Sequence, residues 1–472
     1  MADEQTAGRE GLLHGSSPLS GEGLRAGRGS EIAHVAVVSE DGVRRALRHD
    51  QGSEAHLISW SRHDFTNKGD NYVAEVTSVS VQYRLGTHTR HASYVLKMRR
   101  SHAGSHFDDM VFLKEGKFYT VLLPLLNSEL TSAGQEPLRV PRCLHDVWED
   151  HDSQLFLEDL RLRHFKMYDR KKPLSMAHAS LTVRELARLH AASVMMLSRQ
   201  PRETPPLNFL SWDMSNYSQE TNSAFEALIS GSLQTAGEVA GAAGRKDMQE
   251  WFSSLAPRGP SLLTALTHLA PPFDVIGHGD CWVNNLLFRE DSEGKPVEVM
   301  LVDFQLCRRS SPALDLNYLL FSSLTAAQRS TNLTHLLATY YSSFRAVLTA
   351  AGRVPPFTHE QLTQEFNTKS MFGLIFGALA VPALICDGQD AREFDFKANS
   401  GDHAGDYVLK KRERALRMVT SNPLMRPRLL SLYEDVSRHA PETSMTLRGS
   451  EYLSGKSLTV PSFGEQENHA SA

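Results

Sequence analysis

The chain contains 472 residues, of which 41% are hydrophobic and 22% charged, so it can bury a sizeable core, which argues against wholesale disorder. Its 50 basic and 55 acidic residues give a net charge of −5, too weak a field for sequence-independent binding to nucleic acid, and we expect no nucleic-acid partner. Four cysteines without a C-x-x-C pair indicate neither a disulfide framework nor a cysteine-based zinc site, and favour a reducing compartment.

Both ends of the chain have the composition of disordered tails. Residues 1–30 and 441–472 are poor in large apolar side chains, so burial could not offset the entropy lost on ordering them. The first ten residues, MADEQTAGRE, are polar, which argues against a cleaved secretory signal. We therefore expect a cytoplasmic protein with two mobile tails.

Strand signals dominate from about residue 55 to residue 160, which predicts a small sheet-rich lobe over residues 31–160. Apolar and polar residues alternate over 79–83, a turn with Gly86 follows, and residues 94–98 are again extended, as in a β-hairpin. The apolar run 155–157 predicts a further strand. Gly69 and Asn71, ahead of the hairpin, could close over phosphate groups, but an ordinary turn explains them equally well, and the sequence has no G-x-G-x-x-G.

A lysine on the predicted hairpin and a glutamate on the next helix are candidates for an ion pair. Glu115 interrupts an otherwise apolar helix face that we expect to end at Pro124. Because a buried glutamate without a partner is unfavourable, pairing with Lys97 is the simplest explanation. Such a pair would direct the ammonium group toward phosphates; the alternative is a surface lysine and a solvated glutamate.

Helices dominate after about residue 174, which predicts a helical lobe over residues 161–440. Apolar spacing over 183–194 predicts a helix with one buried face, and we interpret His190 on that face as a hydrogen-bonded core histidine rather than a proton carrier. The apolar run 371–386 is shorter than the roughly 20 residues of a membrane span and contains Pro382. We therefore expect a buried core helix there and no membrane partner.

The sharpest local signal is VIGHGDCWVNN at residues 275–285, followed by an apolar run and Val302-Asp303-Phe304. The turn-like sequence EDSEGK separates two strand-like runs. An antiparallel hairpin centred on Gly294 would place Asn285 beside Asp303 at its open end, with Asp280 one short loop away. The spaced pattern H-x-D-x-x-x-x-N followed by D-F is far more specific than H-x-D alone.

These residue types are typical of phosphoryl transfer. One amide and one carboxylate oxygen suit Mg²⁺ better than zinc, so Asn285 and Asp303 are candidate metal ligands. Asp280 could orient a substrate hydroxyl and take its proton as the phosphoryl group arrives. We include His278, which opens the motif, with Asp280 as a candidate catalytic residue.

Six segments carry a resemblance to a known family, and the resemblance as a whole spans about residues 68–439. They are Lys97, Phe112-x-x-Glu115-x-x-Phe118-Tyr119, Leu157-Glu158-Asp159-Leu160, Leu186-Ala187-Arg188-Leu189-His190-Ala191, His278-Gly279-Asp280-Cys281-Trp282-Val283-Asn284-Asn285 and Val302-Asp303-Phe304-Gln305. Together they resemble the ecdysteroid kinase-like (CHK kinase-like) family of the choline and aminoglycoside kinase group. The HGDCWVNN…VDFQ portion is highly specific for it.

The resemblance implies an α+β, bilobal protein kinase-like fold with a small antiparallel-sheet N-lobe that binds nucleotide and a larger, mostly helical C-lobe. It implies an enzyme that phosphorylates a hydroxyl of a small molecule with ATP and Mg²⁺. Asp280 matches the family's catalytic base, Asn285 and Asp303 its metal ligands, Lys97 its phosphate-contacting lysine, and Glu115 that lysine's partner.

Further positions match supporting parts of the family pattern. Glu158, Asp159 and Leu160 match the segment joining the lobes, where backbone groups would bind adenine. Asp315 matches an aspartate that braces the loop around Asp280, although an ordinary acid at a helix start is an equally good interpretation. Gln305 replaces the glycine of D-F-G, which implies a less switchable metal loop.

Several alternatives stay open. The resemblance allows an ecdysteroid, a choline-like amine or a xenobiotic alcohol as acceptor, and the helical lobe, including residues 207–269, would build its pocket. We expect this small molecule as the partner and no obligate protein partner. The alternative function is a catalytically silent module that binds a small molecule or regulates another protein. The basic run 410–417 is interpreted as the solvated side of a helix, and Arg308 and Arg309 as surface charges.

Overall fold

The computed structural model of the chain describes residues 38–64, 75–99, 106–148, 153–199, 207–210, 219–386 and 404–439. The two predicted tails lie outside these ranges, and so do Gly69 and Asn71. A strand-rich N-terminal part is followed by a mostly helical part, which agrees with the predicted α+β class. The lobe boundaries at residues 31, 160 and 440 stay predictions.

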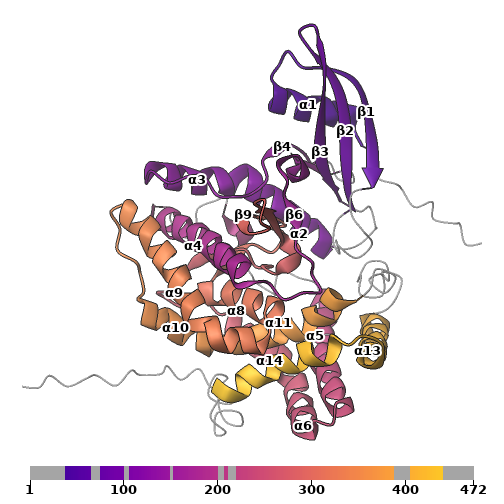
Figure 1. Cartoon of the computed structure of the whole chain (residues 1–472), viewed down its shortest axis with the longest axis vertical. Coiled ribbons are helices and arrows are strands. Elements are labelled where there is room, and N and C mark those ends of the chain that lie inside the picture. The colour runs from indigo at the N-terminus through magenta and orange to yellow at the C-terminus, as the bar shows by residue number, and fades with distance from the viewer. Residues whose placement is uncertain are drawn as a thin grey trace, which may run out of the picture. The chain divides into compact units, whose positions relative to one another are not determined.

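A five-stranded sheet in the order β1-β2-β3-β5-β4 forms the N-terminal part, and every neighbouring pair is antiparallel (Figure 1). The predicted hairpin is present, because β2 and β3 pair from Glu75 opposite Met98 to Leu85 opposite His88. The strand predicted at 155–157 is the middle of β5. The strands are β1 (His56–Asp64), β2 (Glu75–Leu85), β3 (His88–Met98), β4 (Cys143–Val147) and β5 (Gln154–Glu158).

Helix α1 (Glu40–Gln51), which the sequence did not lead us to expect, packs against this sheet through β1 and β4 (Figure 1). Ser39 caps the helix by accepting a hydrogen bond from the N–H of Gly42 at 3.3 Å. Its apolar side is fully buried in a core shared with the sheet, and the buried residues include Val43, Ala46 and Leu47.

The helix that carries Glu115 does not end at Pro124, and that prediction is wrong. Helix α2 (His106–Lys117) continues through a π-helical turn, η1 (Phe118–Leu122), into α3 (Leu123–Ser132), and Pro124 lies in the first turn of α3. A proline inside a continuous helix lacks the N–H that would bond to the preceding turn, and its ring crowds that turn. The π-helical turn before Pro124 is wider than an α-helical turn, and it accommodates this break in the backbone hydrogen-bond pattern.

Gly116, next to Glu115, allows close packing on α2. A Cβ at this position would lie 1.9 Å from Cζ2 of Trp148, so the indole ring lies directly against the helix backbone. The glycine costs the helix on the order of 1 kcal/mol in propensity. The close approach at Gly116 lets the ring of Trp148 also contact Phe112, with ring centroids 5.8 Å apart.

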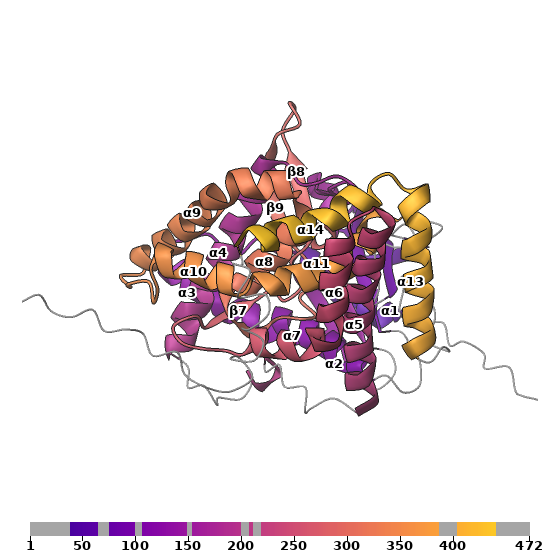
Figure 2. The ribbon, with the colours of Figure 1, turned by 90° about the horizontal axis from the view of Figure 1, so that it is seen from below.

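The C-terminal part is a set of helices around α4, α8 and α11, with short strands at the edge where the site forms. Figure 2 shows α5, α6, α11, α13 and α14 gathered on one side, in agreement with their contacts. The helices are α4 (Met176–Arg199), α5 (Gln219–Ala242), α6 (Lys246–Leu255), α7 (Gly259–Thr267), α8 (Pro312–Ser323), α9 (Ala326–Ala350), α10 (His359–Thr368), α11 (Ser370–Ile385), α13 (Ala404–Ser421) and α14 (Met425–His439). The strands are β6 (Lys166–Met167), β7 (Val275–Gly277), β8 (Leu286–Glu290), β9 (Pro296–Leu301) and β10 (Arg308–Ser310).

The apolar run at 371–386 is a core helix, as predicted. Nearly every side chain of α11 is buried, including Pro382. In the part of the chain that the structure describes, no single helix is long and apolar enough to cross a membrane. The pair α10 and α11 reaches that length and composition only together, across a 52° bend.

Candidate active site

The hairpin that carries the candidate metal ligands is present, but its register differs by one residue from the prediction. The N–H of Val302 donates to the carbonyl oxygen of Asn285 at 3.1 Å, so Asn285 lies opposite Val302 rather than Asp303. The turn is centred on Glu293 rather than Gly294, since Glu290 lies opposite Pro296, and a bulge between Arg289 and Glu290 makes up only part of the difference. Asp303 follows with a φ of 68°, which turns the chain sharply after the strand.

A tight loop after β7 holds Asp280. Gly279 has a φ of 80°, and a Cβ there would lie 2.0 Å from the carbonyl oxygen of Leu306, so only glycine fits. Asn285 Nδ2 donates to both the main-chain oxygen and Oδ2 of Asp280, each at 2.9 Å. The predicted base and one predicted metal ligand are therefore in direct contact.

Asp315, on the first turn of α8, holds this loop from the other side. Its carboxylate accepts the N–H groups of His278 at 2.6 Å and Gly279 at 2.9 Å. His190 Nε2 lies 3.1 Å from the same carboxylate, and its Nδ1 lies 2.7 Å from the hydroxyl of Tyr340. Burial alone would raise the pKa of Asp315, but the hydrogen bond from His190 and the neighbouring groups lower it to about 2. His190 is thus the hydrogen-bonded core histidine that we predicted.

His278 is fully buried, and both of its ring nitrogens contact backbone groups. Nε2 lies 3.0 Å from the carbonyl oxygen of Val302, and Nδ1 accepts the N–H of Asp280 at 3.3 Å. Burial lowers the pKa of His278, which favours the neutral ring. This environment fits a positioning residue that joins two loops better than a group that touches a substrate.

Lys97 bridges the sheet, α2 and the loop after β9. Its Nζ lies 2.6 Å from Oε2 of Glu115 and 3.0 Å from Oδ1 of Asp303. Burial would lower the pKa of Lys97, but the charges of Asp303 and Glu115 raise it above its usual value. Burial also raises the pKa of Glu115 despite the nearby ammonium group. The ion pair expected from the sequence is present and extends to a second acid.

Two neighbours fix Asp303. Phe304 is fully buried and stacks on Phe118 of η1, with centroids 3.6 Å apart and planes 5° from parallel. Gln305 is also buried, and its Nε2 lies 3.4 Å from Oδ2 of Asp303. The residue that replaces the glycine of D-F-G therefore contacts the candidate metal ligand.

Tyr318 is a site residue that the sequence analysis missed. Burial, and then the charge of Asp303, raise the pKa of Asp280 to about 7, whereas hydrogen bonds from Tyr318 and Asn285 oppose the shift. Tyr318 lies three residues after Asp315 on α8, a spacing that puts both residues on one face of the helix. That spacing was the available signal, since Asp315 was already a candidate.

A sequence comparison supplies the family. The profile described as the ecdysteroid kinase-like family matches residues 68–353, which include all the candidate site residues. The chain belongs to the ecdysteroid kinase-like family. Membership, together with the α+β architecture, gives a bilobal kinase-like fold and supports a small-molecule kinase-like phosphotransferase.

Two further comparisons add little to the family assignment. A crystal structure of a protein assigned as a fructosamine-3-kinase from Haemophilus somnus 129PT is similar at 12% identity and a TM-score of 0.32, over 79% of this chain and 97% of that one. No curated protein sequence matches the chain significantly.

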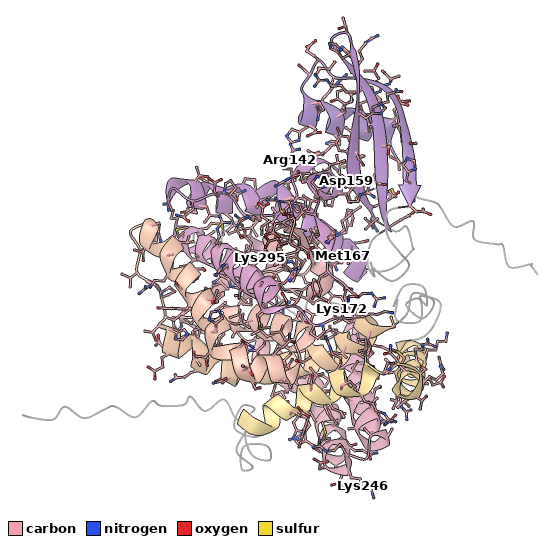
Figure 3. The ribbon with its side chains drawn as sticks, in the orientation of Figure 1. Arg142, Asp159, Met167, Lys172, Lys246 and Lys295 are labelled. Carbon is pink, nitrogen blue, oxygen red and sulfur yellow. The ribbon has the colours of Figure 1, made fainter. Side chains whose placement is uncertain are left out.

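In this member of the ecdysteroid kinase-like family, the side chains of residues 158–160 all contact other residues of the same chain. Glu158 forms ion pairs with Arg142 and Arg163, and Asp159 accepts hydrogen bonds from Ser93 and Arg161. Figure 3 labels Arg142 and Asp159 near the ends of the sheet strands. Leu160 is buried in a small apolar cluster. Only backbone groups of this segment fit the predicted contact with a nucleotide base.

Arg308 and Lys411 are buried, which contradicts the predictions for them, whereas Arg309 and the other basic residues of 410–417 are half-buried or exposed. Arg308 is only 3% exposed because β10 pairs with β7, and Arg309 forms an ion pair with Asp274. Lys411, in the basic run 410–417, is buried with its Nζ 3.3 Å from the carbonyl oxygen of Leu379. Each of these depends on a tertiary neighbour that the local sequence does not reveal.

Within the described ranges, no group of three or more His, Cys, Asp or Glu side chains is arranged to hold a metal ion. The candidate ligands here are one amide and one carboxylate. Such a pair is too small to form a closed protein cage.

Proposed function

We propose that the chain is an ATP- and Mg²⁺-dependent kinase that phosphorylates a hydroxyl group of a small molecule. The observation that carries the proposal is the convergence of Lys97, Asp280, Asn285 and Asp303, which come from opposite parts of the chain. Coulombic repulsion between Asp280 and Asp303 contributes to the raised pKa of Asp280. Two acids that repel each other in a partly exposed site are suited to a divalent cation.

The donor chemistry fits magnesium. Asn285 uses its amide nitrogen on Asp280, which leaves the amide oxygen as the group for a cation. Asn285 and Asp303 would hold the ion with only two protein oxygens, and Mg²⁺ bound by one or two protein groups keeps waters and phosphate oxygens as its other ligands. A bound magnesium ion would neutralise charge on the transferred phosphoryl group.

Each of the site residues then has a separate role in the reaction. Asp280 accepts the proton of the acceptor hydroxyl, and a base with a pKa near 7 is well matched to that task. Lys97 binds nucleotide phosphates, and Glu115 orients its ammonium group. Asp315 and His278 keep the loop around Asp280 in place.

Side chains next to Asp280 favour a neutral, apolar alcohol over a choline-like amine. The rings of Trp282 and Phe376 flank Tyr318, with centroids 6.3 and 5.0 Å from its ring. Phe376 belongs to α11, which contains no charged side chain. A quaternary amine is recognised by aromatic rings together with a carboxylate that balances its charge. Here α11 supplies no carboxylate, and that of Asp280 is already assigned to proton acceptance. Ecdysteroids and hydroxylated xenobiotics meet the apolar requirement.

The test is phosphoryl transfer from ATP labelled on its terminal phosphate. The purified chain with Mg²⁺ is incubated with an ecdysteroid, choline, an aromatic alcohol and a metabolite extract, and products are separated by chromatography. We expect label on an apolar alcohol and little on choline. Asp280→Asn should abolish most of the transfer, whereas the exposed Asp247→Asn should retain it.

Other outcomes point elsewhere. Nucleotide binding without transfer to any compound would support the catalytically silent module. Preferential labelling of choline would overturn the acceptor class while leaving the kinase assignment intact. Label on protein alone would contradict a small-molecule acceptor.

A further inference from the structure

A cavity of about 360 Å³ is lined by residues of α4, α9 and β9, and its volume is in the range of small-molecule sites. Helix α4 packs against both α9 and β9 (Figure 1), and the segment after α3 contributes the rest of the lining. In the part of the chain that the structure describes, none of the candidate active-site residues lines this cavity. It is therefore a separate site, which we call the α4 cavity.

Arginines outnumber acids around the α4 cavity. The charged residues that line it are Arg139, Arg184, Arg188, Glu185 and Glu298. Glu185 is buried, and each of its two oxygens accepts one hydrogen bond from Arg139 and one from Arg188. The acceptor capacity of this carboxylate is thus used within the chain.

Glu298 is likewise shared between two arginines. It accepts hydrogen bonds from Arg139 Nε at 3.3 Å and from Arg289 Nη2 at 2.7 Å. With Arg289 included, the cluster holds four arginines and two glutamates, which leaves an excess of two positive charges. An excess of positive charge around a concave site attracts anions.

Two of these arginines have donors available for a ligand. Arg184 is exposed, and within the described residues its side chain forms no ion pair or hydrogen bond. Arg139 donates through Nε and Nη1, and its Nη2 donates to no group in those same ranges. Guanidinium N–H groups form a planar fork that fits two oxygens of a carboxylate or a phosphate. The α4 cavity therefore offers donors that match such an anion.

Most of the uncharged lining is apolar. Val299 and Val347 are buried, Leu181 is partly buried, and Val297 extends the apolar surface to an exposed position. A ligand with an apolar body would gain by covering these side chains, whereas an inorganic ion would not.

We propose that the α4 cavity binds a small organic anion, whose carboxylate or phosphate group contacts Arg184 and Arg139 and whose apolar body lies against Val299 and Val347. The inference is independent of the kinase function, because the cavity is separate from the candidate active site. Two sources supply this chemistry. One is a phosphate ester of an apolar alcohol, the product class of the proposed reaction, and the other is an apolar carboxylate.

The experiment is a calorimetric titration of the full chain with four probes: phenyl phosphate, phenylacetate, benzyl alcohol and inorganic phosphate. We expect at least one of the two organic anions to bind about tenfold or more tightly than benzyl alcohol and inorganic phosphate. The tighter of the two identifies the source. Saturating Mg²⁺ and ATP should leave this affinity within about twofold, because the nucleotide would bind elsewhere.

Arg184→Gln tests the position of the site. The variant removes charge-assisted hydrogen bonds to the ligand, so it should weaken binding of the organic anion by about tenfold or more. Its melting temperature should equal that of the wild type, since the exposed Arg184 side chain pairs with no other described group. Arg84→Gln, at an exposed position on β2, is the matched control and should bind as the wild type does.

Each contrary result has a definite meaning. Wild-type affinity in Arg184→Gln, or competition by ATP, would place the anion outside the α4 cavity and overturn the proposal. Binding of benzyl alcohol or inorganic phosphate as tight as that of the organic anions would contradict the ligand class, and no binding of either organic anion would remove the site. All of these results leave the kinase assignment standing, because phosphoryl transfer tests that assignment separately.

Discussion

The ammonium nitrogen of Lys97 lies 3.0 Å from Oδ1 of Asp303, although 206 residues separate the two along the chain. The same nitrogen lies 2.6 Å from Oε2 of Glu115. One buried cation thus faces an acid on α2 and an acid on the loop after β9. The contact joins the sheet to the candidate metal loop, so a change at Lys97 affects both the ligand site and the fold.

Lys97→Met is expected to weaken ATP binding at least about tenfold and to destabilise the fold by about 1–3 kcal/mol, because it leaves two acids without their cation. The loss is at the low end for a broken buried pair, since Glu115 can take up a proton. Calorimetric titration and chemical unfolding measure the two effects. Lys295→Met, at the hairpin tip labelled in Figure 3, is the control. Unaltered nucleotide affinity would contradict the assigned contact.

Asp303→Ala should raise the Mg²⁺ concentration needed for half-maximal turnover by about tenfold or more, because it removes the only charged metal ligand among the proposed pair. A chelator should abolish wild-type turnover, and added Mg²⁺ should restore it. The measurement is a magnesium titration at constant ATP. A variant with the wild-type magnesium dependence would show that Asp303 is not a ligand.

Asp280→Asn should lower kcat by about two to four orders of magnitude and at the same time stabilise the fold. The pKa of Asp280 is raised to about 7, so the folded state disfavours the carboxylate, and stability falls as pH rises from about 4 to 7. A neutral amide avoids this penalty, and we expect a gain of about 1–3 kcal/mol at pH 8 that shrinks toward pH 5. Unfolding curves at both pH values check it. A destabilised variant would contradict the electrostatic argument.

Local sequence patterns were sufficient for some elements of this fold. The hairpin of β2 and β3 follows from alternation around Gly86, since both signals lie within the hairpin itself. The Lys97 and Glu115 pair was predictable because a glutamate on an apolar helix face needs a partner, and the strand before it carries a lysine.

Other features depend on tertiary neighbours and could not be predicted locally. The turn is centred on Glu293 rather than Gly294, because Glu290 lies opposite Pro296, and a bulge then brings Asn285 opposite Val302. Nothing in the turn sequence announces either feature. Arg308 is buried because β10, only three residues long, pairs with β7. Tyr318 is indistinguishable in sequence from a core residue of an apolar helix, and only the stacking of its ring on Trp282, two residues after Asp280, places it beside the loop.

Asp315 should make the fold sensitive to acid over a defined range. Its pKa is lowered to about 2, so its stabilisation is complete above the usual value near 4 and is lost as pH falls toward 2. The shift corresponds to about 2 kcal/mol. Thermal melts between pH 2.5 and 5 of wild type and Asp315→Asn measure this contribution as a difference in slope. Parallel curves for the two proteins would rule it out.

Lys411 should reduce stability at neutral pH. Its side chain is buried between α13 and α11, and burial lowers its pKa to about 7. The folded state therefore disfavours the ammonium form, so the penalty is complete below pH 7 and disappears as pH rises toward the unfolded value near 10.5.

Lys411→Met keeps the length of the side chain without the charge, and it should stabilise the protein by about 1–4 kcal/mol at pH 6. The gain should decline between pH 7 and 10, because only the wild type becomes more stable as the lysine loses its proton. Chemical unfolding at pH 6, 8 and 10 measures the trend. Lys410→Met, at the exposed neighbouring position, should show no such dependence. If Lys411→Met is less stable than wild type at pH 6, the hydrogen bond to Leu379 outweighs the cost of burying the charge.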